Sequence, residues 1–98
     1  MTNINTLAAE AYSTAVQRGK TAEKPSHKGT LSSILDEVAE YNRASEKTPS
    51  EHLPQYSEAA EELADICITC LTELHSRGVN VEQVITDKIN FNKTRKNL

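Results

Sequence analysis

The chain has 98 residues, a length that predicts a single domain over residues 1–98. It is 37% hydrophobic and 26% charged, which excludes a disordered or fibrous chain, and its net charge of −3 disfavours nucleic-acid binding. No apolar run approaches the roughly 18–20 residues of a membrane span and no signal peptide is recognisable, so we expect a cytoplasmic protein without membrane contact.

The first two predicted elements are helices separated by a loop. Apolar residues at helical spacing indicate a helix over about residues 5–18, and Gly19 is a suitable stop. Residues 19–29 are rich in Gly, Pro and Lys and predict a loop. A second apolar stripe predicts a helix over about residues 31–45, with Thr30 as its N-cap.

Two more helices are predicted in the second half of the chain. Residues 46–56 contain two prolines and read as a loop. The clearest apolar stripe of the sequence then covers about residues 57–77. The fourth helix opens with VNVEQV, where Asn80 and Gln83 fit a variant capping box, and it runs to about Arg95. The pattern predicts an all-α, four-helix bundle.

Two acidic pairs flank the apolar stripes of the second and third helices. At about 100° per residue, Glu37 lies about 60° from Glu40, and the same spacing separates Glu62 from Asp65. Asp36 lies on the same polar side as Glu40. If the two helices pack antiparallel, four carboxylates converge, which is costly without a cation. Ligands that are all oxygen suit Mg²⁺, or alternatively Mn²⁺, rather than zinc.

A second interpretation of these acids is a solvated face on two amphipathic helices. Several glutamates stand near a helix N-terminus, where the helix dipole favours them, and the spacing alone slightly favours this interpretation. The corresponding function is that of a non-catalytic interaction or regulatory protein. It predicts acids that are exposed and far apart, whereas a metal site predicts acids beside a shared cavity.

The apolar stripe of the fourth helix gives way to polar groups. It begins as Val81, Val84 and Ile85, and the same inward-pointing line continues as Lys88, Asn92 and Arg95. The helix could simply leave the core there, because basic residues suit a helix C-terminus. Alternatively, a lysine, an amide and an arginine fork fit phosphate oxygens. An acidic and a basic cluster in one small domain together suggest a phosphate ester held through a metal.

The two cysteines, Cys67 and Cys70, lie within the apolar stripe of the third helix. A single CxxC pair is only half of a zinc site, and it lacks the βαβ context of a redox pair. We therefore predict buried thiols, and a metal or redox module is the weaker alternative.

A second packing face is predicted on the third helix. Ile68 lies on the side opposite Leu63 and Leu74. In a core this small, such a residue indicates contact with another subunit. We predict a homodimer or a dimer of dimers.

Three stretches of the sequence resemble a known family. ILDEVAEYNRA, AEELADICI and DKINFNKTR resemble the MazG-like nucleoside triphosphate pyrophosphatases, of the all-α NTP pyrophosphatase superfamily. The family pattern E-E-x-x-E, E-x-x-D, then lysine and asparagine on a later helix, matches Asp36-Glu37-x-x-Glu40, Glu62-x-x-Asp65 and Lys88 with Asn92. The matching stretches cover most of residues 31–95.

This resemblance implies a dimer of α-helical domains in which neighbouring subunits complete each active site. It implies Mg²⁺-dependent cleavage of a nucleoside triphosphate between the α- and β-phosphates, which gives a monophosphate and pyrophosphate. By position, the metal ligands would be Glu37, Glu40, Glu62 and Asp65, and Lys88, Asn92 and Arg95 would contact phosphate or nucleotide. Asp36 stands where the family has glutamate, and we predict that it is the general base.

Overall fold

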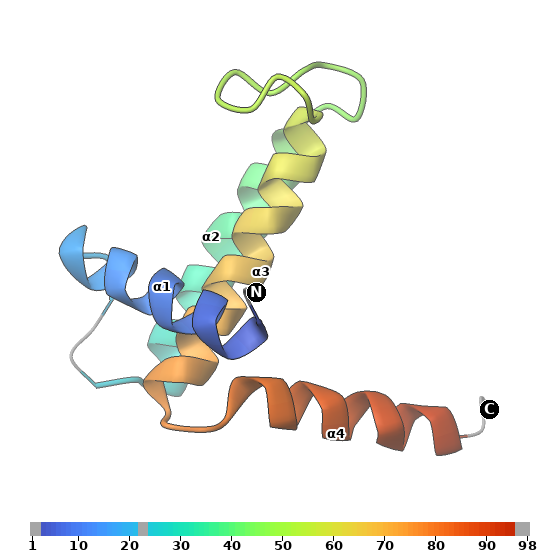
Figure 1. Cartoon of the computed structure of the whole chain (residues 1–98). Coiled ribbons are helices and arrows are strands. Elements are labelled where there is room, and N and C mark those ends of the chain that lie inside the picture. Colours follow the sequence, from blue (N-terminus) through green and yellow to red (C-terminus); the bar gives the residue numbers. More distant parts are fainter. Residues whose placement is uncertain (1–2, 22–23, 96–98) are drawn as a thin grey trace.

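The chain is built from four α-helices (Figure 1). The computed structural model describes residues 3–21 and 24–95, and its helices are α1 (Ile4–Gln17), α2 (His27–Arg43), α3 (Glu58–Ser76) and α4 (Val81–Thr94). The described ranges contain no strand, so the predicted all-α class and the predicted helices are confirmed. None of these four helices combines the length and the apolar character needed to cross a membrane.

Each helix begins at a polar side chain that caps its first turn. Four side chains accept a hydrogen bond from the backbone N–H three residues further on, namely those of Asn3, Ser26, Ser57 and Asn80. The Asn80 cap confirms one half of the predicted capping box. The other half is absent, because the Gln83 side chain instead donates to Asp87 at 2.8 Å.

The start of α2 differs from the prediction. Its N-cap is Ser26 rather than Thr30, because the Ser26 hydroxyl accepts the N–H of Gly29 at 3.0 Å. Gly29 therefore lies in the first turn, where an added Cβ would be only 2.9 Å from Ser26 Oγ. Thr30 lies inside the helix and donates its hydroxyl to Glu73 on α3, which ties the start of α2 to the end of α3.

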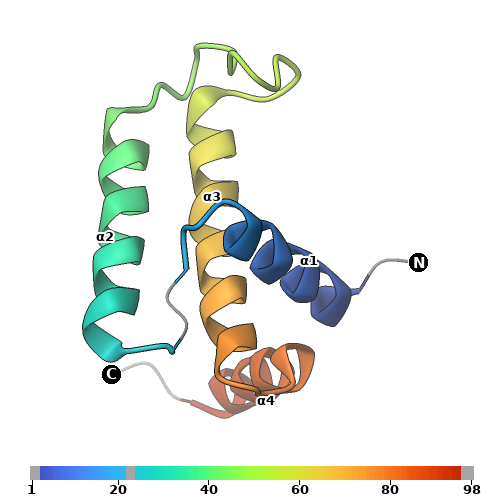
Figure 2. The same cartoon turned by 90° about the vertical axis from the view of Figure 1, so that its left-hand side faces the viewer.

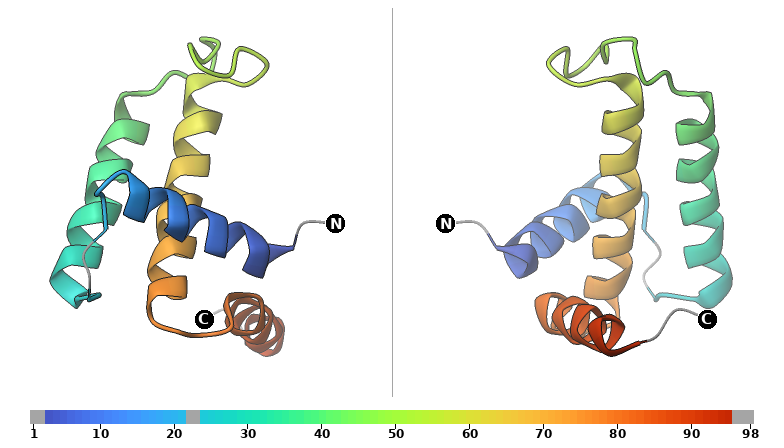
Figure 3. Two further views of the ribbon diagram at one scale, coloured as in Figure 1. Left: turned by 60° about the vertical axis from the view of Figure 1, so that its left-hand side comes forward. Right: turned by 90° about the vertical axis from the view of Figure 1, so that its right-hand side faces the viewer.

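The helices do not form a closed bundle within one chain. α2 and α3 lie side by side and antiparallel, and α1 packs across α3 (Figures 2 and 3). α4 leaves the end of α3 and extends away from the other helices (Figure 1). Val81 is buried and Ile85 is half-buried, whereas every residue from 86 to 95 is exposed. The prediction of a four-helix bundle is therefore wrong for the single chain, because only the beginning of α4 finds apolar cover.

One residue of α1 fixes the beginning of α4. The Asn5 side chain donates to Asn80 Oδ1 at 3.0 Å, and its own oxygen accepts the backbone N–H of Glu82 at 2.9 Å. Asn5 thus satisfies a second N–H of the first turn of α4. The anchor consists of this polar contact and the buried Val81 side chain.

The described residues enclose a very small core. The buried apolar side chains are Ala8, Ala59 and Val81. The accessible surface is 7632 Å², whereas a folded monomer of this mass exposes roughly 5,500 Å². The radius of gyration is 15.0 Å, compared with roughly 13 Å for a compact domain of this length. About 2,000 Å² of surface that a compact monomer would cover is therefore exposed.

Part of this surface is an apolar stripe along α2. Leu31, Leu35 and Val38 are 50%, 54% and 43% exposed, and their spacing places them on one face of the helix. We call these three residues the α2 stripe. Ile68 on α3 is also 46% exposed, but it lines the cavity between α1, α2 and α3 described below, so the structure does not place it on an outer packing face. Contiguous apolar surface of this kind usually marks a protein–protein contact.

The prediction of buried cysteines is wrong for Cys67, which is exposed, and only partly right for Cys70, which is half-buried. Both belong to a side of α3 that includes the exposed Leu63 and is only partly covered by α1 and α2. Burial, with Cys67 close by, raises the pKa of the Cys70 thiol. A raised pKa lowers the thiolate fraction and with it the reactivity of Cys70.

Candidate functional site

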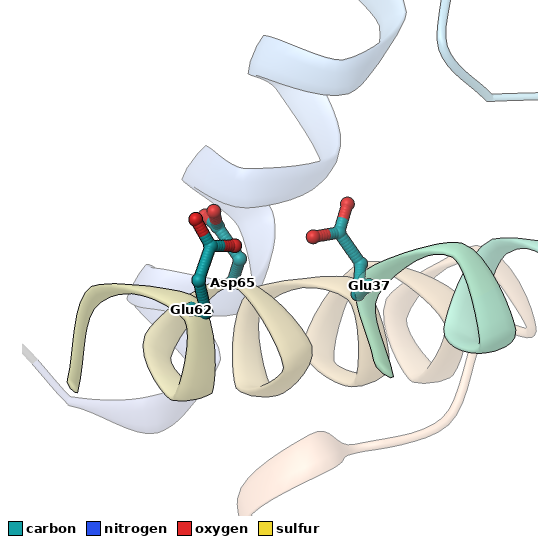
Figure 4. A group of neighbouring side chains, drawn as sticks. All are labelled: Glu37, Glu62 and Asp65. Carbon is teal, nitrogen blue, oxygen red and sulfur yellow. The ribbon is translucent and has the colours of Figure 1, made fainter. Parts of the chain in front are cut away.

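Three of the predicted metal ligands come together between α2 and α3. Glu37 projects from α2, and Glu62 and Asp65 project from adjacent turns of α3 toward the same space (Figure 4). One carboxylate oxygen from each lies within 4.8 Å of the others, and all three residues are half-buried. The antiparallel packing of two helices that each carry an acidic pair at a three-residue spacing produces this group. We call Glu37, Glu62 and Asp65 the acidic triad.

The other two predicted acids lie outside the triad. Glu40 is exposed, and its carboxylate accepts a hydrogen bond from Arg43 Nη2 at 2.8 Å. Asp36 is also exposed, and it lines the cavity described below beside Glu37. The structure therefore places Glu40 in an ion pair at the edge of the site and leaves Asp36 without a place in the triad.

The environment of the triad disfavours its ionised form. Burial raises the pKa of Glu37, Glu62 and Asp65, and a neighbouring carboxylate adds to the effect in each case. Asp65 is the main neighbour for the other two, whereas Glu61 acts on Asp65. Nearby positive charge, chiefly that of Lys20, offsets only part of this effect, and partly desolvated like charges favour the binding of a cation.

The donor atoms of the triad fit a hard divalent cation. Mg²⁺ binds oxygen at about 2.0–2.1 Å, so two of its ligands stand at most roughly 4.2 Å apart. The 4.8 Å limit on the triad oxygens is close to that value, and small side-chain rotations would close the difference. Carboxylates as the donors suit Mg²⁺ or Mn²⁺ better than zinc.

The triad predicts how stability depends on pH and Mg²⁺. A raised carboxyl pKa means that the folded state binds the proton more tightly than the unfolded state. In the metal-free protein, the contribution of these three carboxyl groups to stability should fall with rising pH. The fall begins near their ordinary pKa values, 3.8 for Asp and 4.5 for Glu, and is complete above the raised pKa values of the folded state. Millimolar Mg²⁺ at neutral pH should restore stability and raise the melting temperature by several degrees.

Thermal unfolding of three proteins with and without Mg²⁺ tests this expectation. Glu62→Gln should lose most of the Mg²⁺-dependent gain of the wild type. Glu82→Gln removes an exposed acid on α4 and should keep that gain. Melting that responds to neither Mg²⁺ nor Glu62→Gln would identify the triad as a solvated acidic face.

An open cavity of about 680 Å³ adjoins the triad and lies between α1, α2 and α3. Glu37 and Asp65 lie in its wall together with Asp36, while Glu62 stands outside it. The volume is within the range of roughly 300–1,000 Å³ that is typical of small-molecule sites. The remaining wall combines apolar residues of α1 and α3 with hydroxyl groups, two more acids, Glu10 and Glu73, and two cations.

The two cations of this cavity are Arg18 and Lys20, which the sequence analysis did not single out. They flank Gly19 at the end of α1, and no pattern of spacing relates them to the acids. The predicted stop at Gly19 could have drawn attention to these two residues, because side chains beside a helix end can turn toward a neighbouring helix. Which helix lies there depends on tertiary packing.

The predicted basic line on α4 does not point inward in the single chain. Lys88, Asn92 and Arg95 are all exposed. Lys88 Nζ lies 4.9 Å from the centre of the Phe91 ring, and Arg95 Nη1 donates to Asn92 Oδ1 at 3.3 Å. The inward prediction is wrong because α4 departs from the other helices after Ile85.

The connection between α2 and α3 is fastened to the start of α3. Ser50, which is 2% exposed, donates its hydroxyl to Glu61, and His52 Nδ1 lies 3.1 Å from the same carboxylate. The hydrogen bond from Ser50 lowers the pKa of Glu61, and the contact with Glu61 raises the pKa of His52. These contacts hold the turn of α3 that carries Glu62.

The acidic triad, the adjoining cavity and the two cations together form the candidate functional site. Comparisons with protein-family models, with curated proteins and with solved structures find no match to this chain. Any functional assignment therefore rests on the geometry of this site and on the motifs in the sequence.

Proposed function

We propose that the protein is a Mg²⁺-dependent, MazG-like nucleoside triphosphate pyrophosphohydrolase. It cleaves an NTP or dNTP between the α- and β-phosphates and releases a nucleoside monophosphate and pyrophosphate. The observation that carries the proposal is the convergence of Glu37, Glu62 and Asp65 beside a cavity of about 680 Å³. A cytoplasmic location, where nucleoside triphosphates are plentiful, belongs to the same proposal.

Each acid has its own task in this proposal. Glu37, Glu62 and Asp65 would hold the metal, which would supply a nucleophilic water at neutral pH and neutralise phosphate charge. Asp36 takes the proton of the attacking water, because it lines the cavity and stays outside the triad. Glu40 would be a further ligand if it left Arg43, and an exposed ion pair of this kind costs little to break.

The proposal includes a homodimer or a dimer of dimers in which the basic end of α4 completes the site of a partner subunit. Lys88, Asn92 and Arg95 are exposed on a helix that extends away from α2 and α3. The excess surface of about 2,000 Å² is of the size that obligate homodimers bury. The basic end of α4 also complements the charge of the acidic triad.

The decisive experiment is a panel of NTPs and dNTPs incubated with Mg²⁺, with the products separated by ion-exchange chromatography. Monophosphate and pyrophosphate in equal amounts support the proposal. Diphosphate and inorganic phosphate would contradict the predicted position of cleavage. No turnover of any nucleotide, with Mg²⁺ or with Mn²⁺, would favour the non-catalytic interaction protein, for which the exposed α2 stripe is the supporting observation.

Mixing two inactive variants should restore activity if the site is shared between subunits. Asp65→Asn damages the acidic triad and Lys88→Ala removes a cation of α4, so each variant alone should be nearly inactive. In a heterodimer, one site carries both substitutions and the other carries neither. Random reassociation should therefore recover about a quarter of wild-type activity.

The control for this recovery is a mixture of two triad variants, Asp65→Asn and Glu37→Gln, which should stay inactive. If the Lys88→Ala mixture also stays inactive, Lys88 does not act across the subunit boundary. If Lys88→Ala alone has full activity, the basic end of α4 takes no part in the reaction.

A further inference from the structure

The cavity beside the acidic triad has cations as well as acids in its wall. Arg18 and Lys20 line it from the end of α1, while Glu37 and Asp65 line it from α2 and α3. The sequence motifs of the proposed function assign phosphate contacts only to α4. These motifs give no task to Arg18 and Lys20.

The end of α1 fixes the backbone of Lys20, whose side chain is exposed. Gly19 has a φ of 68°, which glycine adopts without strain. Its N–H donates to the carbonyl of Val16 at 3.0 Å, and the N–H of Lys20 donates to the carbonyl of Ala15 at 2.9 Å. These two hydrogen bonds form a Schellman motif, which fixes the backbone on both sides of the glycine. Both cations thus start from an ordered backbone.

The cations stand near the acids without pairing with them. Among the ion pairs of the described residues, none involves Arg18 or Lys20. The positive charge of Lys20 nevertheless acts to lower the pKa of Glu37 and Asp65, and Arg18 acts in the same direction on Asp65. A cavity whose wall contains both cations and carboxylates can accept a group that carries both signs, such as a metal-bound phosphate.

We propose that Arg18 and Lys20 bind the phosphate chain of the substrate within the cavity of their own subunit. This inference rests on the proposed function and adds a polyphosphate subsite to it. The guanidinium of Arg18 can donate hydrogen bonds to two phosphate oxygens, and the ammonium group of Lys20 can pair with a third. Thr21, which follows Lys20 and lines the same cavity, offers a hydroxyl to the same anion. Inorganic pyrophosphate and triphosphate should occupy this subsite without a nucleoside.

A purely structural role makes a different prediction for the same residues. Cations near a helix C-terminus interact favourably with the helix dipole, so Arg18 and Lys20 could serve only the stability of α1. In that case their removal lowers the melting temperature and leaves anion binding unchanged. Binding of an inorganic anion separates the two roles, because it requires neither turnover nor a nucleoside.

The test is isothermal titration of the protein with inorganic triphosphate in the presence of Mg²⁺. Arg18→Gln and Lys20→Gln should each weaken binding by about tenfold or more, because each removes a charge-assisted contact. Lys20→Arg keeps the charge and should bind nearly as the wild type does. Lys47→Gln removes an exposed lysine in the connection between α2 and α3, and it should have no effect.

Wild-type affinity in both glutamine variants, or no binding of triphosphate by the wild type, would overturn the inference. These outcomes differ from a failure of the proposed function. If the protein binds triphosphate through Arg18 and Lys20 but hydrolyses no nucleotide, the proposed subsite is supported and the proposed enzyme activity is wrong. If the protein hydrolyses nucleotides while both glutamine variants bind triphosphate normally, only the proposed subsite is wrong.

Discussion

Replacing Asp65 with asparagine is expected to lower kcat by at least roughly 10³ and, at the same time, to stabilise the metal-free protein. Asparagine keeps the shape and one oxygen of the side chain but loses the charge that the metal requires. The stability should rise because Asp65 is the carboxylate that most strongly raises the pKa of both Glu37 and Glu62. Removal of its charge relieves that repulsion.

Steady-state kinetics and metal-free thermal unfolding measure these opposite effects in one variant. The matched control is Glu82→Gln, which removes one negative charge from the first turn of α4; it should leave kcat unchanged and should not stabilise the protein, because an acid near a helix N-terminus is slightly favourable. Loss of activity together with loss of metal-free stability would mean that Asp65 supports the fold. Unchanged activity would remove the triad from the reaction.

The second large effect is expected on the α2 stripe. Leu35→Asp places a charge in the middle of this stripe, where the wild-type leucine is 54% exposed in the single chain. If the stripe is an interface between two copies, each dimer would bury two such charges. A total cost on the order of 4 kcal/mol would weaken dimerisation by about 10³-fold. Sedimentation equilibrium should show dimers for the wild type and monomers for Leu35→Asp at micromolar concentration.

A charge at a solvent-facing position is the control for this substitution. Ser13 is exposed on α1, on the side of the helix away from the buried Ala8, so Ser13→Asp should remain dimeric. A monomeric wild type would contradict the predicted oligomer directly. A dimeric Leu35→Asp variant would leave the oligomer in place and move its interface away from the α2 stripe.

The sequence predicted the features that depend on residues close together along the chain. The four helices, the stop at Gly19 and the cap at Asn80 are set within one or two turns, and all three were found. The convergence of the acidic triad was also predictable in large part. Acids at a three-residue spacing beside an apolar stripe must lie near the groove between two packed helices.

The features that the sequence could not predict depend on what lies beyond each helix. Cys67 belongs to an apolar stripe, yet part of that stripe has no cover within the chain. Glu40 has the spacing of a metal ligand, but Arg43 lies one turn away and competes for its carboxylate. Lys20 reaches the cavity only because the end of α1 packs beside α2 and α3. Periodicity predicts the face on which a residue lies but not what covers that face.

Because α4 is anchored to the other helices only at its beginning, a small rotation there becomes a large displacement at its far end. The ten exposed residues from 86 to 95 form a free arm of about 15 Å beyond the anchor at Val81 and Ile85. A tilt of only about 10° at the anchor moves the tip by roughly 2.6 Å, whereas a hydrogen bond tolerates a few tenths of an ångström. The chain that carries α4 thus sets the direction of the arm only coarsely. The surface that receives the arm determines where its basic end comes to rest.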